Sequence, residues 1–392
     1  MQNAYIVAAV RTPVGKAFRG VFRNTRPDDL LAHVLKAALA EVPALDPARV
    51  EDVIIGCAMP EAEQGMNVAR IGLLLAGLPD PVPGVTVNRF CSSGLQTIAM
   101  AADRIRLGEA DVMIAGGTET MSMIPMMGHK IAMNPAVFQD DNLAIAYGMG
   151  ITAEKVAQQW QIDRRAQDQF AFQSHQKAVT AIDNGELTEI RPITVTSHQP
   201  SADGTVRVME QLVDTDEGPR RDTSLEALAR LRPAFKADGT VTAGNSSQMS
   251  DGAAALILVS EKIVDELKLD PLALFRGFSV AGVAPEIMGI GPIAAVPKVL
   301  ASTGISQQDL DWIELNEAFA AQSLAVIKDL ELDAEKVNPL GGAIALGHPL
   351  GATGAVLSAK LVHGLQRRQQ KFGMVTMCIG TGMGAAGIFE SV

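Results

Sequence analysis

Short strand-like runs alternate with helix-like runs along almost the whole chain, and this alternation constrains the fold more than any other sequence feature. The strand-like runs are rich in β-branched or large apolar residues and cover residues 5–10, 52–56, 85–87, 112–115, 254–259, 312–315 and 374–379. Between them lie helical patterns such as residues 30–39, 94–107 and 355–365. Alternation of this kind predicts an α/β fold in which helices cover parallel sheets.

The two ends of the chain resemble each other. Residues 50–56 are similar to residues 310–316, and residues 111–116 are similar to residues 374–380. We interpret this likeness as the duplication of one unit rich in strand–helix–strand motifs. The alternative is chance, because all α/β proteins repeat such patterns.

The segment at about 119–249 interrupts this repeat. It is rich in Met, Gln and Asp, and it contains helical patterns at 152–159 and 164–184. We expect it to form an inserted loop domain that covers one face of the body.

Composition and charge narrow the class of protein. Of the 392 residues, 47% are apolar and 20% are charged, which permits a large core and excludes wholesale disorder. The net charge of −11 argues against binding nucleic acid through the overall field of the protein. The longest apolar run, residues 253–259, is too short to span a bilayer. The first residues read as a strand and not as a signal peptide.

The cysteines indicate a reducing environment. The chain has three, Cys57, Cys91 and Cys378, which are too few and too scattered for a disulfide framework. No Cys-x-x-Cys or His-x-x-x-His pair is present in the sequence, so no metal site is expected. We therefore expect a cytoplasmic protein without a membrane span.

Cys91 is the first candidate for chemistry. It follows the strand-like residues 85–88 and precedes a helical pattern that begins near Gly94. Free N–H groups and the positive end of the helix dipole stabilise a thiolate at such a turn, which predicts a lowered pKa and a nucleophile. The alternative is a small buried cysteine at a turn.

His348 lies in a glycine-rich turn before a predicted helix, between Gly347 and Pro349. A histidine fixed in this way can approach a substrate closely, and a neutral imidazole suits the removal of a thiol proton. The alternative is a turn histidine bonded to backbone carbonyls. The density of glycines favours the functional interpretation.

Two further candidates follow predicted strands. Cys378 ends a strand and enters a glycine-rich turn, at the place where ligands of α/β sheets usually bind, but taken alone it is a core cysteine. Asn316 also follows a strand and suits a bound water or an oxyanion, although it is equally well a helix N-cap. Glu317 is expected to begin a helix, where its charge suits the dipole.

Possible anion contacts are less sharply indicated. Arg220 and Arg221 form a basic pair that suits phosphates. Ser247 closes a polar turn at residues 243–247 that suits a slender ligand.

Four segments together resemble the motifs of the thiolase family. They read VNRFCSSG at 87–94, NEAFA at 316–320, GGAIALGHP at 341–349 and CIGTGMG at 378–384, and the likeness extends over essentially the whole chain. The resemblance implies a duplicated five-layer αβαβα body that forms homodimers or homotetramers. Its N-terminal half would cover residues 1–268, including the loop domain at about 119–249, and its C-terminal half residues 269–392.

The resemblance also implies roles for individual residues. Cys91 would be the acylated nucleophile, and His348 the base that activates it. His348 and a water on Asn316 would then stabilise the acetyl-CoA enolate, while Cys378 exchanges the proton at the enolate carbon. The backbone N–H groups of Cys91 and Gly380 would hold the oxyanion of the acyl-enzyme.

The implied substrates are acyl-CoA and CoA, with coenzyme A as co-substrate and no resident cofactor or metal. Arg220 and Ser247 match family positions that contact coenzyme A. The family further implies a possible dehydrogenase or hydratase partner from β-oxidation.

One position bears on the direction of the reaction. Biosynthetic acetoacetyl-CoA thiolases usually carry His directly before Met149, where this chain has Gly148. The likeness is therefore closer to degradative 3-ketoacyl-CoA thiolases, and we expect room for longer acyl chains. The alternatives are an acetyl-CoA C-acetyltransferase and, from another class, an acyl-CoA or lipid carrier without turnover.

Overall fold

A single mixed sheet runs through the computed structural model, which describes residues 2–201 and 203–392. Its strand order is β10-β11-β12-β9-β1-β8-β5-β3-β4, and the short β2 (Gly15–Lys16) pairs with β8. The strands are β1 (Ala4–Arg11), β3 (Asp52–Gly56), β4 (Gly84–Val87), β5 (Val112–Thr120), β8 (Ser250–Ser260), β9 (Ala273–Gly282), β10 (Leu310–Leu315), β11 (Phe372–Ile379) and β12 (Met383–Ser391).

The two halves of the sheet repeat one topology. In the first half β1 runs antiparallel to β8, β8 antiparallel to β5, and β5 parallel to β3. In the second half β9 runs antiparallel to β12, β12 antiparallel to β11, and β11 parallel to β10. The strands that resemble each other in sequence, β3 with β10 and β5 with β11, therefore take equivalent places, as the duplication predicts.

The prediction of parallel sheets is wrong for most of these pairs. Among the described strands, parallel pairing is confined to β3–β4, β3–β5 and β10–β11. The turn from Ile379 to Met383 is too short for a crossover, so β12 can only return antiparallel beside β11.

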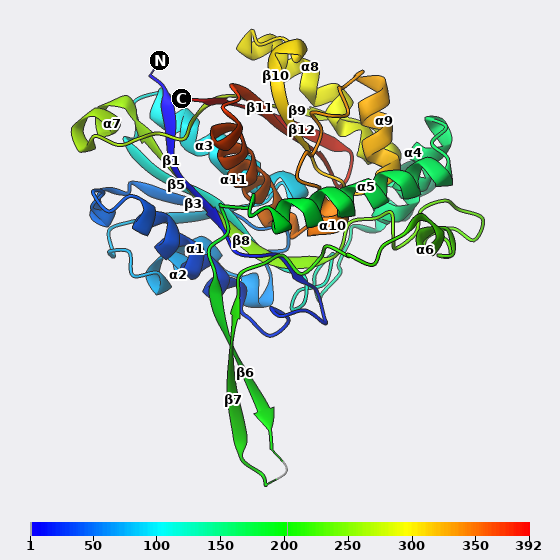
Figure 1. Ribbon diagram of the computed structural model, residues 1–392, viewed down its shortest axis with the longest axis horizontal. Coiled ribbons are helices and arrows are strands. Elements are labelled where there is room, and N and C mark those ends of the chain that lie inside the picture. Colours follow the sequence, from blue (N-terminus) through cyan, green and yellow to red (C-terminus); the bar gives the residue numbers. More distant parts are fainter. Residues whose placement is uncertain (1, 202) are drawn as a thin grey trace.

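Helices complete the five layers (Figure 1). Two of them, α3 (Ser93–Arg106) and α11 (Leu350–Arg368), form the central layer and share one core with both halves of the sheet. The outer face of the first half packs on α1 (Pro27–Glu41) and α2 (Val68–Leu75), and that of the second half on α8 (Gly291–Thr303). The remaining helices outside the insertion are α7 (Glu261–Leu267), α9 (Ala320–Asp329) and α10 (Ala343–Leu346).

Glycines let the two central helices approach closely. A Cβ on Gly94 would lie 2.6 Å from the backbone nitrogen of Ala355, and a Cβ on Gly354 would collide with the backbone of Leu95. Any side chain at these two positions would force the helices apart. The contact also sets the distance between the segments that precede α3 and α11, where Cys91 and His348 lie.

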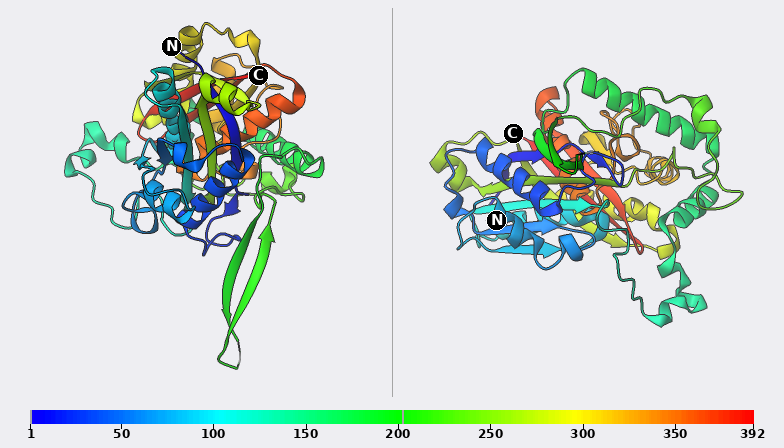
Figure 2. Two further views of the ribbon diagram at one scale, coloured as in Figure 1. Left: turned by 90° about the vertical axis from the view of Figure 1, so that its left-hand side faces the viewer. Right: turned by 90° about the horizontal axis from the view of Figure 1, so that it is seen from below.

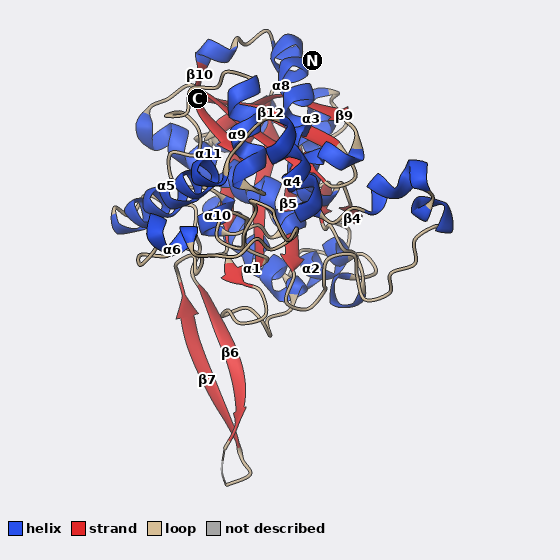
Figure 3. Ribbon diagram, turned by 90° about the vertical axis from the view of Figure 1, so that its right-hand side faces the viewer, coloured by secondary structure: helices blue, strands red, loops and turns tan. Residues whose placement is uncertain are grey.

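The insertion contributes α4 (Met149–Gln159), α5 (Arg164–Asp183), α6 (Leu225–Ala229) and a hairpin of β6 (Ile193–Pro200) and β7 (Val206–Val213). The helices α4 and α5 confirm the two predicted helical segments. The hairpin was not predicted, and it projects far from the body in Figures 1 and 3 and in the left view of Figure 2. Within the described residues, no helix is both long and apolar enough to cross a membrane.

Candidate active site

Cys91 lies in the turn between β4 and α3, as the sequence predicts. A short 3-10 turn over Phe90–Ser92 carries it, and Phe90 adopts a left-handed backbone with φ of 44°. The hydroxyl of Ser93 accepts from the backbone N–H of Arg89 (2.9 Å) and donates to the carbonyl of Phe90 (2.7 Å). These two bonds fix the turn, so that the Cys91 thiol borders a cavity.

The second cysteine is brought to the same place by β11. Cys378 is buried near the end of that strand, and the turn into β12 begins with Gly380. The backbone N–H of Gly380 donates to the sulfur of Cys91. Burial raises the pKa of Cys378, and the negative charge of a Cys91 thiolate raises that pKa further. The two thiols, far apart in sequence, thus converge on one site.

His348 and Asn316 contact each other, and His348 lies two residues before Leu350, which lines the cavity next to Cys91. The Nδ2 atom of Asn316 lies 3.3 Å from Nε2 of His348. The backbone of His348 is held by bonds from its N–H to the carbonyl of Gln248 and to the hydroxyl of Ser250, both 3.1 Å long. Among the described residues the buried Oδ1 of Asn316 has no hydrogen-bond partner. A buried amide oxygen of this kind suits a bound water or ligand.

The protonation states differ from the sequence-based expectation. Burial raises the pKa of Cys91 to about 11, and the Gly380 and Cys91 N–H groups oppose this only in part. The prediction of a lowered pKa is therefore wrong, because the cost of desolvation exceeds the effect of the N–H donors. Burial also lowers the pKa of His348 to about 4. At neutral pH the resting pair is consequently a thiol and a neutral imidazole.

The cavity next to Cys91 is mostly apolar. It has a volume of about 450 Å³, and Cys91, Gly380 and Leu350 contribute to its lining. Five methionines contribute to its apolar lining, namely Met59, Met126, Met127, Met133 and Met149. Flexible methionine side chains adapt to the shape of an apolar ligand. Gly148 also lines this cavity.

The two predicted anion contacts lie in different places. Ser247 is beside the active site, because its backbone N–H donates to the carbonyl of Ala318 (2.9 Å). Arg220 lines a separate cavity of about 490 Å³ together with Arg221 and His175. His175 accepts from the backbone N–H of Arg220 (3.2 Å), and burial followed by the Arg220 charge lowers its pKa to about 4.

Two buried carboxylates support the site, and the sequence did not reveal their role. Glu119, at the end of β5, accepts from the backbone N–H groups of Ala58 (2.7 Å) and Gly351 (2.8 Å). It thereby ties the segment after β3 to the start of α11. Both partners lie far from Glu119 in sequence, so local patterns carry no signal for these bonds.

Glu317 was predicted to begin a helix, but α9 starts only at Ala320. Glu317 instead lies buried and accepts from Ser174 Oγ (2.6 Å), Asn338 Nδ2 (2.9 Å) and the N–H of Ile344 (3.2 Å). It holds the segment that leads to His348 against the loop that carries Asn316.

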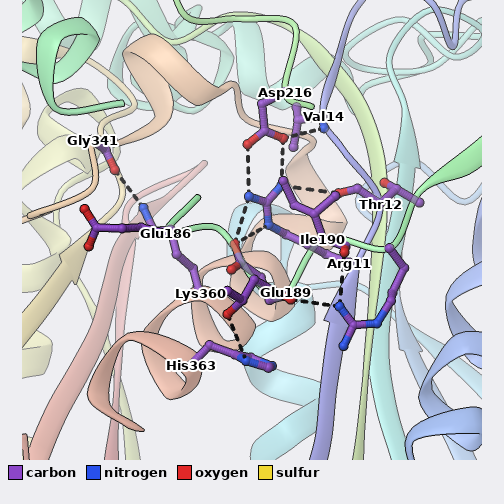
Figure 4. A network of polar contacts seen from close by, with 12 residues as sticks. Arg11, Thr12, Val14, Glu186, Glu189, Ile190, Asp216, Gly341, Lys360 and His363 are labelled. Carbon is purple, nitrogen blue, oxygen red and sulfur yellow. Dashed lines mark hydrogen bonds and ion pairs between the residues drawn. The ribbon is translucent and has the colours of Figure 1, made fainter. Parts of the chain in front are cut away.

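A buried guanidinium fastens the insertion to the sheet (Figure 4). Arg11 of β1 donates to Glu189 (2.9 Å) and binds both oxygens of Asp216 (2.7 and 2.9 Å). Glu189 precedes β6 and Asp216 follows β7, so one side chain clamps both ends of the projecting hairpin. Nearby, Lys360 of α11 donates to the carbonyl of Gly341 (2.7 Å), at the start of the glycine-rich segment.

Comparisons with known proteins agree with this architecture. Residues 4–262 match the thiolase N-terminal domain, and residues 269–391 match the thiolase C-terminal domain. The chain is 52% identical to the 3-ketoacyl-CoA thiolase of Bacillus subtilis (strain 168) and 46% identical to that of Pseudoalteromonas translucida (strain TAC 125). Each alignment covers 100% of both proteins.

Two solved structures are similar to this chain over its full length. The acetyl-CoA acetyltransferase of Bacillus anthracis has a TM-score of 0.90 and 42% identity, and human mitochondrial 3-ketoacyl-CoA thiolase has a TM-score of 0.89 and 39% identity. Each comparison covers 100% of this chain and 99% of the other. Both halves of the sequence, the fold and the convergence of the motif residues thus agree, and the chain belongs to the thiolase family.

Proposed function

We propose that this protein is a 3-ketoacyl-CoA thiolase, which cleaves 3-ketoacyl-CoA with CoA to give acetyl-CoA and a shortened acyl-CoA in fatty-acid β-oxidation. The observation that carries the proposal is that Cys91 and Gly380 line one cavity, with the buried Cys378 near enough for a charge on Cys91 to raise its pKa, together with the contact of His348 with Asn316. Full-length relatives that bear this enzyme's name support it.

The first half of the reaction forms the acyl-enzyme. The Cys91 sulfur attacks C3 of the substrate while Nε2 of His348 takes the thiol proton. The C2–C3 bond then breaks, and its electron pair leaves as the acetyl-CoA enolate. His348 and a water on Asn316 stabilise the enolate oxygen, and Cys378 donates its proton to C2.

The second half releases the shortened product. The Cys378 thiolate takes the proton of the incoming CoA thiol, and the CoA sulfur attacks the acyl group on Cys91. The N–H groups of Cys91 and Gly380 hold the oxyanion, a type of contact worth on the order of 3 kcal/mol per donor. Cys91 regains its proton from His348. The cycle needs no electron acceptor, so we propose that no resident cofactor or metal takes part.

Coenzyme A would reach the site past the insertion. Ser247 lies beside the Asn316 loop, and the cavity at Arg220 offers the guanidinium group of that residue for phosphates. We therefore assign both residues to the binding of coenzyme A.

Acetyl-CoA C-acetyltransferase activity is the second candidate, since one structural neighbour carries that name. The apolar, methionine-lined cavity and Gly148 favour longer acyl chains over a dedicated four-carbon substrate. A CoA-dependent cleavage assay over a chain-length series separates the two: a sharp optimum at four carbons would reject the degradative assignment.

Acylation of Cys91 distinguishes the enzyme from a carrier without catalytic activity. Incubation of the wild type with acyl-CoA should add the acyl mass to Cys91, and Cys91→Ala should abolish the adduct. Tight binding without CoA-dependent cleavage would favour the carrier instead.

We further propose that the protein forms homodimers or homotetramers. On the edge of the sheet β4 pairs with β3 alone among the described strands, and large apolar side chains are exposed beside it at Met66, Leu74, Leu75 and Val85. An open edge next to apolar surface suits pairing with a second copy. Light scattering would determine the oligomer.

A cytoplasmic location is consistent with three unpaired cysteines in the described part of the chain. A β-oxidation dehydrogenase or hydratase partner stays a prediction, and co-purification with these enzymes from the native host would test it.

A further inference from the structure

We propose that Thr353 is a positioning residue that selects the tautomer of His348, placing the imidazole proton on Nδ1 and the lone pair that accepts protons on Nε2. The inference rests on the proposed role of His348 as the base. The motif around His348 drew attention to its glycines, and Thr353 entered no sequence-based prediction.

The contacts of the Thr353 hydroxyl determine the direction of each hydrogen bond. Its Oγ1 lies 2.6 Å from Nδ1 of His348 and 2.8 Å from the carbonyl oxygen of Pro349. A hydroxyl has one proton to donate, and a carbonyl can only accept. If the hydroxyl proton turned toward Nδ1, two oxygen atoms 2.8 Å apart would face each other without a proton between them. The hydroxyl therefore donates to Pro349 and accepts from Nδ1–H.

The opposite side of the ring requires the same tautomer. There Nε2 lies 3.3 Å from Nδ2 of Asn316, an amide nitrogen that can only donate. A proton on Nε2 would leave two donors facing each other. Two separate neighbours, Thr353 and Asn316, thus agree that the lone pair is on Nε2.

Burial of His348 makes the tautomer of its imidazole important for the proposed reaction. His348 is 5% exposed and Thr353 is 1% exposed. Bulk water therefore does not reach the imidazole and cannot replace the Thr353 hydroxyl as its hydrogen-bond partner. The buried imidazole is neutral, as its lowered pKa indicates, and a neutral ring carries its proton on one nitrogen only. A ring with its proton on Nε2 has no lone pair there to accept the Cys91 proton.

Thr353 is itself firmly held. It lies in the first turn of α11, and its bond to Pro349 spans four residues back along the chain. Its β-branched side chain has few rotamers in a helix, so the oxygen stays directed at the imidazole.

The test compares Thr353→Val, which keeps the shape but removes the hydroxyl, with Thr353→Ser, which restores it. Ser358→Ala is the matched control, since Ser358 is a buried hydroxyl on the same helix that donates to Gly354 O (2.7 Å) four residues back. Unlike Thr353, Ser358 has no bond to His348 among the described contacts.

Three measurements are needed. The first is kcat and KM for CoA-dependent cleavage, the second is the rate at which iodoacetamide alkylates Cys91, and the third is the ¹⁵N spectrum of histidine-labelled protein, with the His348 signal assigned by His348→Asn. General-base catalysis contributes roughly 10²–10⁴-fold, so we expect Thr353→Val to lower kcat and the alkylation rate about 10- to 100-fold while KM changes less than about twofold. Thr353→Ser and Ser358→Ala should stay near the wild type.

The spectrum keeps the inference falsifiable even if Thr353→Val does not fold. In the wild type we expect the His348 proton on Nδ1, and in Thr353→Val a larger share on Nε2. A wild-type proton on Nε2, or a Thr353→Val enzyme with normal kcat and alkylation, would overturn the role of Thr353. Failure of the proposed function would look different, because the wild type would then show no CoA-dependent cleavage whatever its tautomer.

Discussion

The backbone N–H of Gly380 donates to the sulfur of Cys91, although 289 positions separate the two residues in the printed numbering. This bond joins the turn after β11 to the turn before α3, and so joins the two duplicated halves at the proposed nucleophile. Each half contributes one cysteine, Cys91 from the first and Cys378 from the second. A site built in this way forms only when both halves pack correctly.

Replacing Cys91 and replacing Cys378 should each block a different step of the reaction. Cys378→Ala should still become acylated by a simple acyl-CoA, because Cys91 and His348 remain, but it should lose cleavage of the C2–C3 bond, because no acid protonates the enolate. Intact-protein mass spectrometry measures the acylation, and release of acetyl-CoA measures the cleavage. Cys57→Ala is the matched control, since Cys57 is a buried cysteine outside the active-site cavity. Normal thiolysis by Cys378→Ala would remove that residue from the mechanism.

Stability should depend on pH through His348. Its pKa is about 4 in the folded protein, against about 6.5 in an unfolded chain. Between these values the unfolded chain binds more protons, so the free energy of unfolding falls as the pH drops from about 6.5 to 4, by on the order of 3 kcal/mol from this group. His348→Gln should remove that contribution.

Urea unfolding of both proteins at pH 7.0, 5.5 and 4.5 measures the difference. His175, whose pKa is also lowered, titrates in both proteins and cancels in the comparison. Equal losses of stability in the wild type and His348→Gln would contradict the assignment of a buried neutral His348.

The close approach of α3 and α11 gives a packing prediction. A methyl group at Gly354 would collide with the backbone of Leu95, so Gly354→Ala should destabilise the protein by about 1–3 kcal/mol. It should also lower activity, because Cys91 and His348 precede these two helices. Gly282→Ala is the control, since the nearest atom to its added Cβ is 4.0 Å away and its backbone conformation suits any residue. Thermal unfolding and kcat of both variants test this, and an unchanged Gly354→Ala would show that the helices separate freely.

Much of this arrangement could be predicted from the sequence, because the groups that we propose to carry the chemistry follow recognisable local patterns. Cys91, Asn316 and Cys378 each come at or beyond the end of a strand, and His348 precedes a helix within a dense run of glycines. The likeness in sequence between β3 and β10 and between β5 and β11 also predicts the repeated topology of the sheet. The lowered pKa expected for Cys91 was wrong because it considered the helix terminus alone, whereas burial depends on the whole fold.

Other features have no local signal. The strands β9 and β12 are interspersed with glycine and alanine, which resemble turns when the partner strand is unknown. The bond from Gly351 to Glu119 joins residues 232 positions apart, and the clamp of Arg11 on Asp216 joins residues 205 positions apart. Such contacts follow from tertiary structure and cannot be inferred from periodicity.

The Arg11 clamp leads to the last prediction. Arg11→Met should destabilise the protein by about 3–5 kcal/mol, because it leaves the buried carboxylates of Glu189 and Asp216 without a positive partner. Arg221→Met is the matched control: Arg221 makes a similar two-pronged pair with Asp183, but both side chains are more than half exposed. Surface pairs of this kind are worth about 0–1 kcal/mol, so the control should unfold near the wild type.

Loss of the Arg11 ion pairs should first affect the β6–β7 hairpin and not the whole fold. Since Glu189 and Asp216 border the β6–β7 hairpin, amide hydrogen exchange should increase first in residues 189–201 and 203–216 of Arg11→Met, at denaturant concentrations where the central helices remain protected. Adding Glu189→Gln and Asp216→Asn to Arg11→Met removes the two uncompensated charges and should restore part of the stability. If the triple variant were no more stable than Arg11→Met, the cost would lie in lost packing around the arginine stem and not in the buried charges.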